Sequence, residues 1–204
     1  MKNQVSNTRT SFNPVFLRII KENHAKILRL DARKKRIKEE LVKENGEDNG
    51  NMPKGKIQLL ENELAEASLI VVVFSAMAIE AYIYDYAARH LGDTFVKDHL
   101  DKLDTLSKWI IIPDLITGRE VPRHGNWREL LTKLIKVRNS IIHHKSSDPS
   151  AASRDTKKYL KKLSDESELI YETARQSITL LGVLADKIIE IDPEETPWVK
   201  SYLA

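Results

Sequence analysis

The sequence predicts an all-α protein, a helical bundle of four to five main helices with a long antiparallel helical hairpin at its N-terminus. Three observations lead to this prediction. Apolar residues recur at helical spacing along most of the chain. The breaks between these runs contain the Gly, Pro, Asn and Asp residues that end helices. No segment alternates between apolar and polar residues strongly enough to predict a strand.

The 204 residues are expected to form one domain, because composition does not separate the two halves of the chain. Residues 12–55 should supply the first helix and the loop of the hairpin, and residues 56–191 the core of the bundle. The hydrophobic share of 41% and the charged share of 31% are typical of a globular protein with many exposed charges.

Composition also excludes several classes of function. The chain has no cysteine, which excludes disulfides, thiolate metal sites and thiol nucleophiles. The formal charge of +3 is too small to identify a nucleic-acid binder, but it does not oppose one. The first residues lack the apolar core of a signal peptide. A cytoplasmic protein that does not enter a membrane is therefore the simplest expectation.

Two long helices are predicted in the first half of the chain. Asn13-Pro14 is a typical helix start. A heptad seam follows it, with polar interruptions at Asn23 and Lys34, and its apolar members are Phe16, Ile20, Ile27, Leu30, Ile37 and Leu41. Residues 45–53 predict a loop. A second seam comes next, so the two helices should pair as a hairpin; it consists of Leu60, Leu64, Ala67, Val71, Phe74 and Ala78.

The second helix becomes apolar on all sides between residues 69 and 83, as expected of the central helix of a bundle. Its most apolar stretch, residues 69–79, is too short to span a bilayer and runs into Glu80. This stretch therefore predicts a buried core helix.

Shorter helices are predicted next. Gly92-Asp93-Thr94 should end the second helix and cap a short third one. Another short helix should run up to Pro113, and it carries Leu103, Leu106, Trp109 and Ile110. Residues 117–126 contain two groups of Pro or Gly, which predicts an exposed loop.

The last third of the chain predicts two more helices. The first covers residues 127–144, and a turn-rich linker follows it at residues 146–153. The second is a long helix over residues 165–191, which Asp192-Pro193 should stop.

The helix at residues 127–144 carries an unusual charge. At about 100° per residue, one face of this helix is apolar, and its members are Leu131, Leu134, Ile135, Ile141 and Ile142. Arg138 falls in the middle of this apolar arc. A permanently charged side chain in such a place needs a partner, because an unpaired buried charge is unfavourable. Glu80, in the apolar central helix, is the obvious candidate.

Asn139 and His143 are four residues apart, so they should neighbour each other at one border of the apolar arc, next to Arg138. Helical phase turns His144 to the opposite border. Two interpretations stay open at this point. Arg138 is either a structural residue neutralised by a buried carboxylate, or a member of a functional patch with Asn139 and His143.

The segment Arg138-Asn139-Ser140-Ile141-Ile142-His143 resembles the motif of HEPN-domain proteins: Arg, a polar residue, then His after four to six intervening residues, on a late helix of an all-α bundle. Residues 74–81, FSAMAIEA, look like the upstream helix of that family, which often carries a Glu in an apolar context. The resemblance covers roughly residues 60–190. It implies a homodimer and a metal-independent endoribonuclease of the toxin or antiviral-effector type, while other members of the family have lost catalysis and serve as binding modules.

The chemistry of RNA cleavage suits these residue types. Attack by the 2′-OH needs a proton acceptor, a proton donor for the leaving 5′-oxygen and a cation for the phosphate. His titrates in the range that proton transfer requires, and Arg can hold phosphate oxygens with two hydrogen bonds. We expect His143 to transfer protons, Arg138 to stabilise the phosphate, Asn139 to orient either of them, and Glu80 to position Arg138. A single His in each chain would have to act as both the proton acceptor and the proton donor. We therefore expect the site to be shared across a two-fold dimer.

Further contacts with RNA are expected at Lys136, His144 and Lys145. Some HEPN toxins have a Tyr two residues after the motif His, which a partner enzyme modifies, but Lys145 occupies that place here. An antitoxin or regulatory protein remains a possible partner. The basic run of the first helix is most simply a solvated face, since Glu39, Glu40 and Glu44 follow it; it consists of Arg29, Arg33, Lys34, Lys35, Arg36 and Lys38.

No cofactor or metal is expected. The sequence has no glycine-rich phosphate loop, no HExxH motif and no nucleophile elbow. Asp98, His99 and Asp101 could ligate a metal, but in a charged stretch they are more simply a solvated surface. Besides the endoribonuclease, two alternatives stay open: a catalytically silent HEPN-like dimeric interaction or nucleic-acid-binding module, and a structural helical scaffold that uses the hairpin as a coiled coil.

Overall fold

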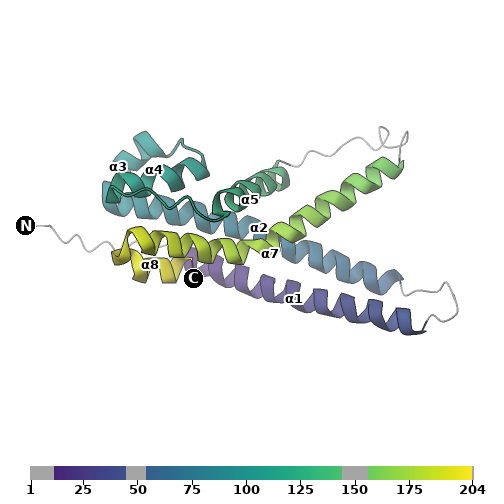
Figure 1. Cartoon of the computed structure of the whole chain (residues 1–204). Coiled ribbons are helices and arrows are strands. Elements are labelled where there is room, and N and C mark those ends of the chain that lie inside the picture. The colour runs from purple at the N-terminus through teal and green to yellow at the C-terminus, as the bar shows by residue number, and fades with distance from the viewer. Residues whose placement is uncertain (1–11, 45–53, 144–155, 204) are drawn as a thin grey trace, which may run out of the picture.

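The computed structural model describes residues 12–44, 54–143 and 156–203, and every regular element in these residues is helical (Figure 1). Helix α1 (Asn13–Glu44) and helix α2 (Lys54–Leu91) run antiparallel along most of the molecule. The predicted all-α class and the long N-terminal hairpin are therefore confirmed. The predicted loop at residues 45–53 lies outside the described residues.

The seam of the hairpin follows the predicted heptads. Ile20, Ile27 and Leu30 of α1 are buried against α2. Its two polar members each find a partner. The side-chain amide of Asn23 donates a hydrogen bond of 2.9 Å to the carbonyl of Ile19, and Lys34 forms an ion pair of 2.8 Å with Glu61 of α2. The polar interruptions therefore cost the seam little.

Helix α2 is the centre of the bundle. It contacts α1, helix α4 (Thr105–Thr117), helix α5 (Trp127–Ile142) and helix α7 (Thr156–Ile191). Residues 57–91 are long and apolar enough to cross a membrane by length and composition alone, and 44% of their most apolar window is buried inside the structure. The core helix of a helical bundle passes the same test.

The turn at Gly92 separates α2 from the short helix α3 (Asp93–Phe95), which continues as a π-helical turn, η1 (Val96–Leu100). Gly92 has φ of 88°, a left-handed conformation that a residue with a side chain adopts only with strain. The predicted helix boundary at this point is confirmed. Helix α4 follows, and the carboxylate of its N-cap residue, Asp104, accepts a hydrogen bond of 3.0 Å from the backbone N–H of Ser107.

The prediction that the fourth helix runs up to Pro113 was too short. Helix α4 continues through Pro113 to Thr117 and ends at Gly118, which has φ of 67°. A proline removes one hydrogen bond of the helix and strains the turn before it. Pro113 is buried, and its packing in the core favours continuation of the helix.

The C-terminal part of the chain differs from the prediction in two places. Helix α7 begins at Thr156, nine residues before the predicted start, and ends at Ile191 as expected. After Asp192-Pro193 the chain forms a 3-10 turn, η2 (Pro193–Glu195), and helix α8 (Thr196–Tyr202), which the sequence pattern did not indicate. The predicted linker at residues 146–153 lies outside the described part of the chain.

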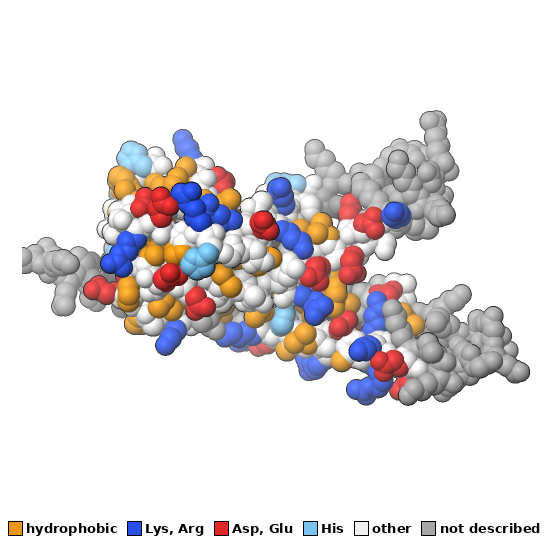
Figure 2. Space-filling view, viewed as in Figure 1, with side chains coloured by type: hydrophobic (Ala, Val, Ile, Leu, Met, Phe, Trp, Pro, Cys, Tyr) orange, Lys and Arg blue, Asp and Glu red, His pale blue; other side chains and the backbone are white. Residues whose placement is uncertain are grey.

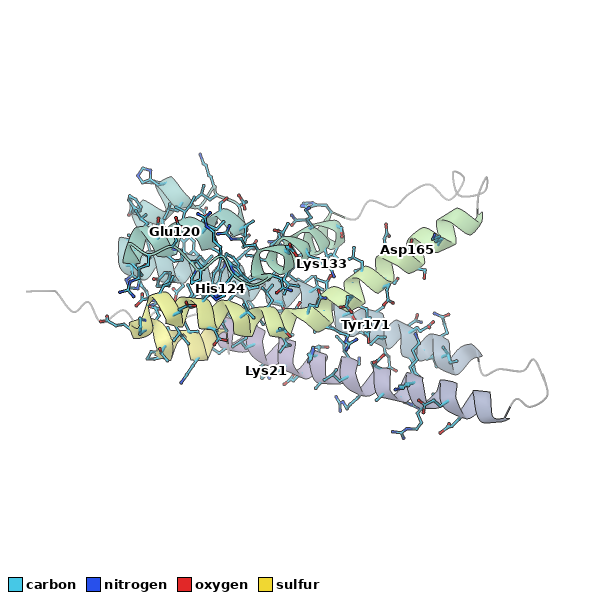
Figure 3. All side chains as sticks on the ribbon, viewed as in Figure 1. Lys21, Glu120, His124, Lys133, Asp165 and Tyr171 are labelled. Carbon is cyan, nitrogen blue, oxygen red and sulfur yellow. The ribbon has the colours of Figure 1, made fainter. Side chains whose placement is uncertain are left out.

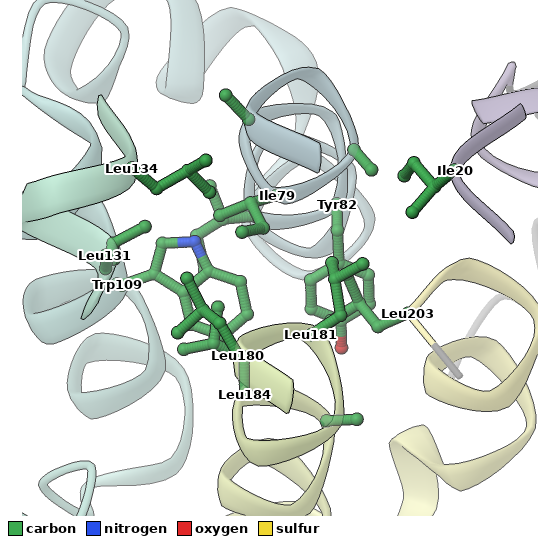
Figure 4. Packing of buried hydrophobic residues seen from close by; sticks show 14 of the residues in the cluster. Ile20, Ile79, Tyr82, Trp109, Leu131, Leu134, Leu180, Leu181, Leu184 and Leu203 are labelled. Carbon is green, nitrogen blue, oxygen red and sulfur yellow. The ribbon is translucent and has the colours of Figure 1, made fainter. Parts of the chain in front are cut away.

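The core lies where α2, α4, α5 and α7 meet (Figure 4). Trp109 of α4 is fully buried and stacks on Tyr82 of α2, with ring centroids 5.7 Å apart. Around this pair pack aliphatic side chains of the surrounding helices, namely Ile79, Leu131, Leu134, Leu180 and Leu184. Burying large aromatic side chains contributes strongly to stability. This core fixes α5, the helix of the Arg-Asn-His motif, against α2.

Candidate functional site around Arg138

Helix α5 presents an apolar inner face and a polar outer face. Its inner residues are buried, and they are Trp127, Leu131, Leu134 and Val137. The indole N–H of Trp127 donates a hydrogen bond of 3.0 Å to the carbonyl of Pro122, which fixes the start of the helix. Arg138 follows Val137 on the inner side, and its side chain is only 18% exposed.

The Arg138 guanidinium has two side-chain partners. One Nη donates a hydrogen bond to Oε1 of Glu80 on α2, and the other donates a bond of 3.0 Å to Oδ1 of Asn139. The predicted pairing of Glu80 with Arg138 is therefore confirmed. Glu80 is less buried than its apolar surroundings in the sequence suggested, since its side chain is 38% exposed. The pair lies at the edge of the core.

Thr105, the first residue of α4, is a partner of Glu80 that the sequence did not indicate. Its hydroxyl donates a hydrogen bond of 2.7 Å to Oε1, the same oxygen that Arg138 contacts. Three helices, α2, α4 and α5, thus meet at one carboxylate. Because Oε1 accepts both bonds, the carboxylate is held in one orientation, and it holds Arg138 in turn.

Arg138 and Glu80 line an open groove of about 590 Å³. Its lining includes apolar residues of α1 and α2, among them Phe16, Met77 and Tyr84. The acids Asp101 and Asp104 and the base Lys108 also line it, and Nζ of Lys108 lies 3.6 Å from Oδ1 of Asp101. The hydroxyl and backbone N–H of Ser107 donate to Asp104 and hold the pKa of its carboxyl below the ordinary value. The groove therefore contains fixed charges of both signs.

Among the described residues no hydrogen bond joins His143 to Arg138. Residues five apart on a helix differ in direction by roughly 140°, so Arg138 points toward α2 while His143, the C-cap of α5, is exposed. Asn139 lies between them and is also exposed; its carbonyl accepts a hydrogen bond of 3.0 Å from the backbone N–H of His143. Within the described residues His143 makes no side-chain hydrogen bond. Among these three side chains a hydrogen bond joins Arg138 to Asn139, and the expected convergence with His143 stays a prediction.

The residues expected to touch RNA are only partly described. Lys136 is exposed on the outer face of α5. His144 and Lys145 lie outside the described residues. In the basic run of α1, Lys34 belongs to the hairpin seam, where it pairs with Glu61, while Arg29 and Arg33 are exposed.

One group of side chains has the composition of a metal site: His90, Asp192 and Glu195 offer ligand atoms that lie within 4.8 Å of one another. Arg89 already satisfies the carboxylate of Glu195, with Nη to Oε distances of 2.5 and 2.8 Å. His90 Nε2 lies 3.1 Å from the same carboxylate. A guanidinium in this position supplies the positive charge that a metal ion would bring. These residues therefore form a polar network that joins the end of α2 to η2.

The network holds Glu195 ionised in the folded protein. Burial opposes ionisation of this carboxyl, but the hydrogen bonds and charges of His90 and Arg89 outweigh burial and place its pKa below the ordinary value. Tyr86 donates a hydrogen bond of 2.9 Å to Asp192, and burial together with this bond raises the pKa of the Tyr86 hydroxyl. The network explains why the residues after Asp192-Pro193 are ordered against α2.

The second candidate metal cluster, Asp98, His99 and Asp101, lies on the surface of the protein. His99 is exposed and its ring packs on that of Phe95, with centroids 4.9 Å apart. Asp101 lies beside Lys108, and Asp98 is exposed. The arrangement matches the expected solvated face of a helix.

The Glu80–Arg138–Asn139 chain, with Thr105 behind it, is a hydrogen-bonded polar arrangement that opens to a groove. Such an arrangement can hold the guanidinium cation of Arg138 at a fixed point beside a ligand. Thr105 could not have been found from helical phase, because its contact depends on how α4 crosses α2. Comparison with models of protein families, with curated proteins and with solved structures gives no match to this chain.

Proposed function

We propose that this protein is a HEPN-type endoribonuclease that cleaves RNA without a metal ion, by attack of the 2′-OH on the adjacent phosphate. The observation that carries the proposal is the hydrogen-bonded chain of Glu80, Arg138 and Asn139. Two of the five N–H donors of Arg138 are used in this chain and the one on Nε is buried, which leaves one N–H on each Nη for the oxygens of a phosphate. In this role the protein acts in the cytoplasm, as a toxin or an antiviral effector.

The proposed chemistry assigns one task to each residue. The 2′-OH attacks phosphorus and gives up its proton, the bond to the 5′-oxygen breaks, and that oxygen receives a proton. The products are a 2′,3′-cyclic phosphate and a 5′-hydroxyl. His143 carries the proton, Arg138 stabilises the charge on the phosphate oxygens, and Asn139 orients Arg138 through its hydrogen bond. Glu80 is the positioning residue of Arg138.

The exposure of His143 supports a site built from two copies of the chain. His143 is exposed at the end of α5 and makes no hydrogen bond to Arg138 within the described residues, so a second copy can present a His to each Arg138. Large apolar side chains are exposed close to the motif, which suits a contact between copies: Met77 lines the groove beside Glu80, and Ile142 precedes His143. In this proposal a two-fold axis passes near the end of α5.

A separate observation favours a second candidate function. Glu80, Asp101 and Asp104 outnumber the two cations that line the groove, Arg138 and Lys108. An excess of carboxylates opposes the approach of a phosphate backbone. This favours a catalytically inactive HEPN-like module, in which the motif only holds a dimer or docks a regulatory protein.

One experiment separates the two functions. Purified protein is incubated with mixed RNA in the presence of EDTA, next to a His143→Ala variant. The nuclease cleaves the RNA, and the variant does not. If neither protein cleaves RNA while light scattering shows a dimer that Arg138→Ala disrupts, the inactive module is correct.

A further inference from the structure

A second groove, of about 550 Å³, lies between the outer face of α5 and the first half of α7. None of the residues that line it lines the Arg138 groove. In Figure 3, Lys133 lies on the part of α5 that passes beside α7. We call it the α5–α7 groove, and its lining residues are Arg128, Glu129, Thr132, Lys133, Lys136, Val137 and Leu169.

The α5–α7 groove carries uncompensated positive charge. It has three cations and a single acid, Glu129. Lys133 donates a hydrogen bond of 3.1 Å to the neutral side chain of Gln176. The guanidinium of Arg128 lies over the ring of Trp127, 5.2 Å from its centroid, and Lys136 is exposed. Within the described residues none of these cations lies within ion-pair distance of a carboxylate, whereas Lys34, Lys108 and Arg138 do.

The surface between these cations is apolar. Val137 is buried beneath it, and Leu169 of α7 is 45% exposed at its edge. The long side chains of lysine and arginine also present aliphatic stems below their charged ends. A ligand that suits this groove is therefore anionic along its length and has flat apolar parts. A single strand of RNA has both properties, because its phosphates repeat and its bases are unpaired.

The same face of α5 leads from the groove to His143. Lys133, Lys136, Ser140 and His143 follow one another at spacings of three and four residues, which places them in one row along the helix. Lys136 and His143 are about 10 Å apart along the helix axis, at 1.5 Å per residue. In Figure 2, Lys and Arg side chains lie over α5 on the face of the molecule that is turned toward the viewer.

We infer that the α5–α7 groove binds one strand of RNA, with phosphates at Arg128, Lys133 and Lys136, and leads it along α5 to His143. The inference rests on the proposed function, and it adds a binding surface that lies apart from Arg138. It also explains how an RNA substrate reaches the motif although the Arg138 groove itself holds an excess of carboxylates.

The test measures binding without cleavage. A fluorescein-labelled 2′-O-methyl oligouridylate, which has no nucleophilic 2′-OH, is titrated with the full chain at several salt concentrations. The variant Arg128→Gln/Lys133→Gln/Lys136→Gln should bind more weakly, and the slope of log affinity against log salt should fall by about 2, at about 0.7 per lost phosphate contact. The matched control removes three cations of α1, Arg29→Gln/Arg33→Gln/Arg36→Gln, and should keep the wild-type slope.

The possible results are distinct. An unchanged slope in the groove variant, an equal fall in the α1 control, or binding of polyglutamate in the groove in place of the oligouridylate overturns the inference. If the triple variant does not fold, Lys136→Gln alone should lower the slope by about 0.7. If wild type does not cleave RNA that carries a 2′-OH, but its binding of the oligouridylate still depends on the groove residues, only the proposed function is wrong. If wild type cleaves RNA and the groove variant cleaves it with the same kcat/KM, only this inference is wrong.

Discussion

Thr105 and Arg138 donate hydrogen bonds to the same oxygen of Glu80, although they come from different helices. The backbone of α4 therefore helps to set the position of a guanidinium on α5. The pair is half-buried rather than enclosed, because 38% of the Glu80 side chain is exposed. Water can replace part of the interaction when one partner is removed, so its contribution to stability is smaller than that of a fully buried pair.

Glu80→Ala should lower both stability and activity. Removing the carboxylate takes the partner from one Nη of Arg138, whose side chain is only 18% exposed, and the expected loss is about 1–3 kcal/mol. The midpoint of thermal unfolding should fall by about 2–4 °C for each kcal/mol. Glu66→Ala on the same helix is the control, because its pair with Lys26 is exposed and 4.0 Å long. Equal midpoints for the two variants would show that Glu80 does not hold Arg138.

Thr105→Val should weaken the site while keeping the shape of the side chain. The variant loses one hydrogen bond to Oε1 of Glu80, which costs about 1 kcal/mol. If Thr105 is a positioning residue, kcat for RNA cleavage should fall while KM stays near its wild-type value, and Thr105→Ser should restore kcat. A loss of stability that serine restores without any change in kcat would limit Thr105 to a structural role.

His143→Ala should abolish most of the cleavage without unfolding the protein. The side chain is exposed at the end of α5, so the unfolding midpoint should stay within about 1–2 °C, as for other surface substitutions. The cleavage rate should fall by about 10²–10⁴-fold, the usual contribution of general acid–base catalysis. His99→Ala, on the exposed η1 turn, serves as the control, and His144→Ala should lower the rate much less than His143→Ala. A greater loss of cleavage rate in His144→Ala than in His143→Ala would show that His143 is not the catalytic histidine.

RNA cleavage should proceed without divalent metal ions and should leave 2′,3′-cyclic phosphate ends. His143 and Arg138 can supply proton transfer and charge stabilisation for attack by the 2′-OH. Rates should therefore be the same with EDTA and with magnesium, and mass spectrometry of the products should detect the cyclic phosphate. Replacing the 2′-OH at the cleaved position with hydrogen should stop cleavage there. Cleavage of DNA, or activity that depends on magnesium, would exclude this chemistry.

The stability of the fold should decrease in acid because of Glu195. The pKa of this carboxyl is lower in the folded protein than its ordinary value of 4.5. The unfolded chain therefore takes up a proton near pH 4.5 that the folded chain does not yet accept, and acid favours unfolding. The contribution is complete above that pH and is lost as the pH falls toward the folded pKa. Urea unfolding of wild type and Glu195→Gln should show that the variant lacks part of this acid-side decrease.

Sequence patterns were sufficient for the parts of the fold that repeat. The seams of α1 and α2 follow heptads, so the hairpin could be predicted, including the polar interruption at Lys34 that pairs with Glu61. The Glu80–Arg138 pair could be predicted as well, since each residue is a single charge in an apolar helical stretch. Both predictions depend on helical periodicity and on the cost of unpaired charge.

Other features depend on tertiary contacts that no local pattern records. The first nine residues of α7 are mostly charged or polar, so their helical periodicity is weak. Helix α8 is short, and the turn η2 that precedes it is fixed by the contact of Glu195 with Arg89, far away in the sequence.

The contact between Arg89 and Glu195 also sets an order of events during synthesis of the chain. The two residues are 106 positions apart, so a ribosome that adds about 5–20 residues per second needs roughly 5–20 s to pass from one to the other. Throughout that interval the guanidinium at the end of α2 has no Glu195 to neutralise it. The partner of Arg138, by contrast, is made 58 residues before it. The central helix can therefore complete its charged contacts only after Glu195 has been made, long after its own synthesis has finished.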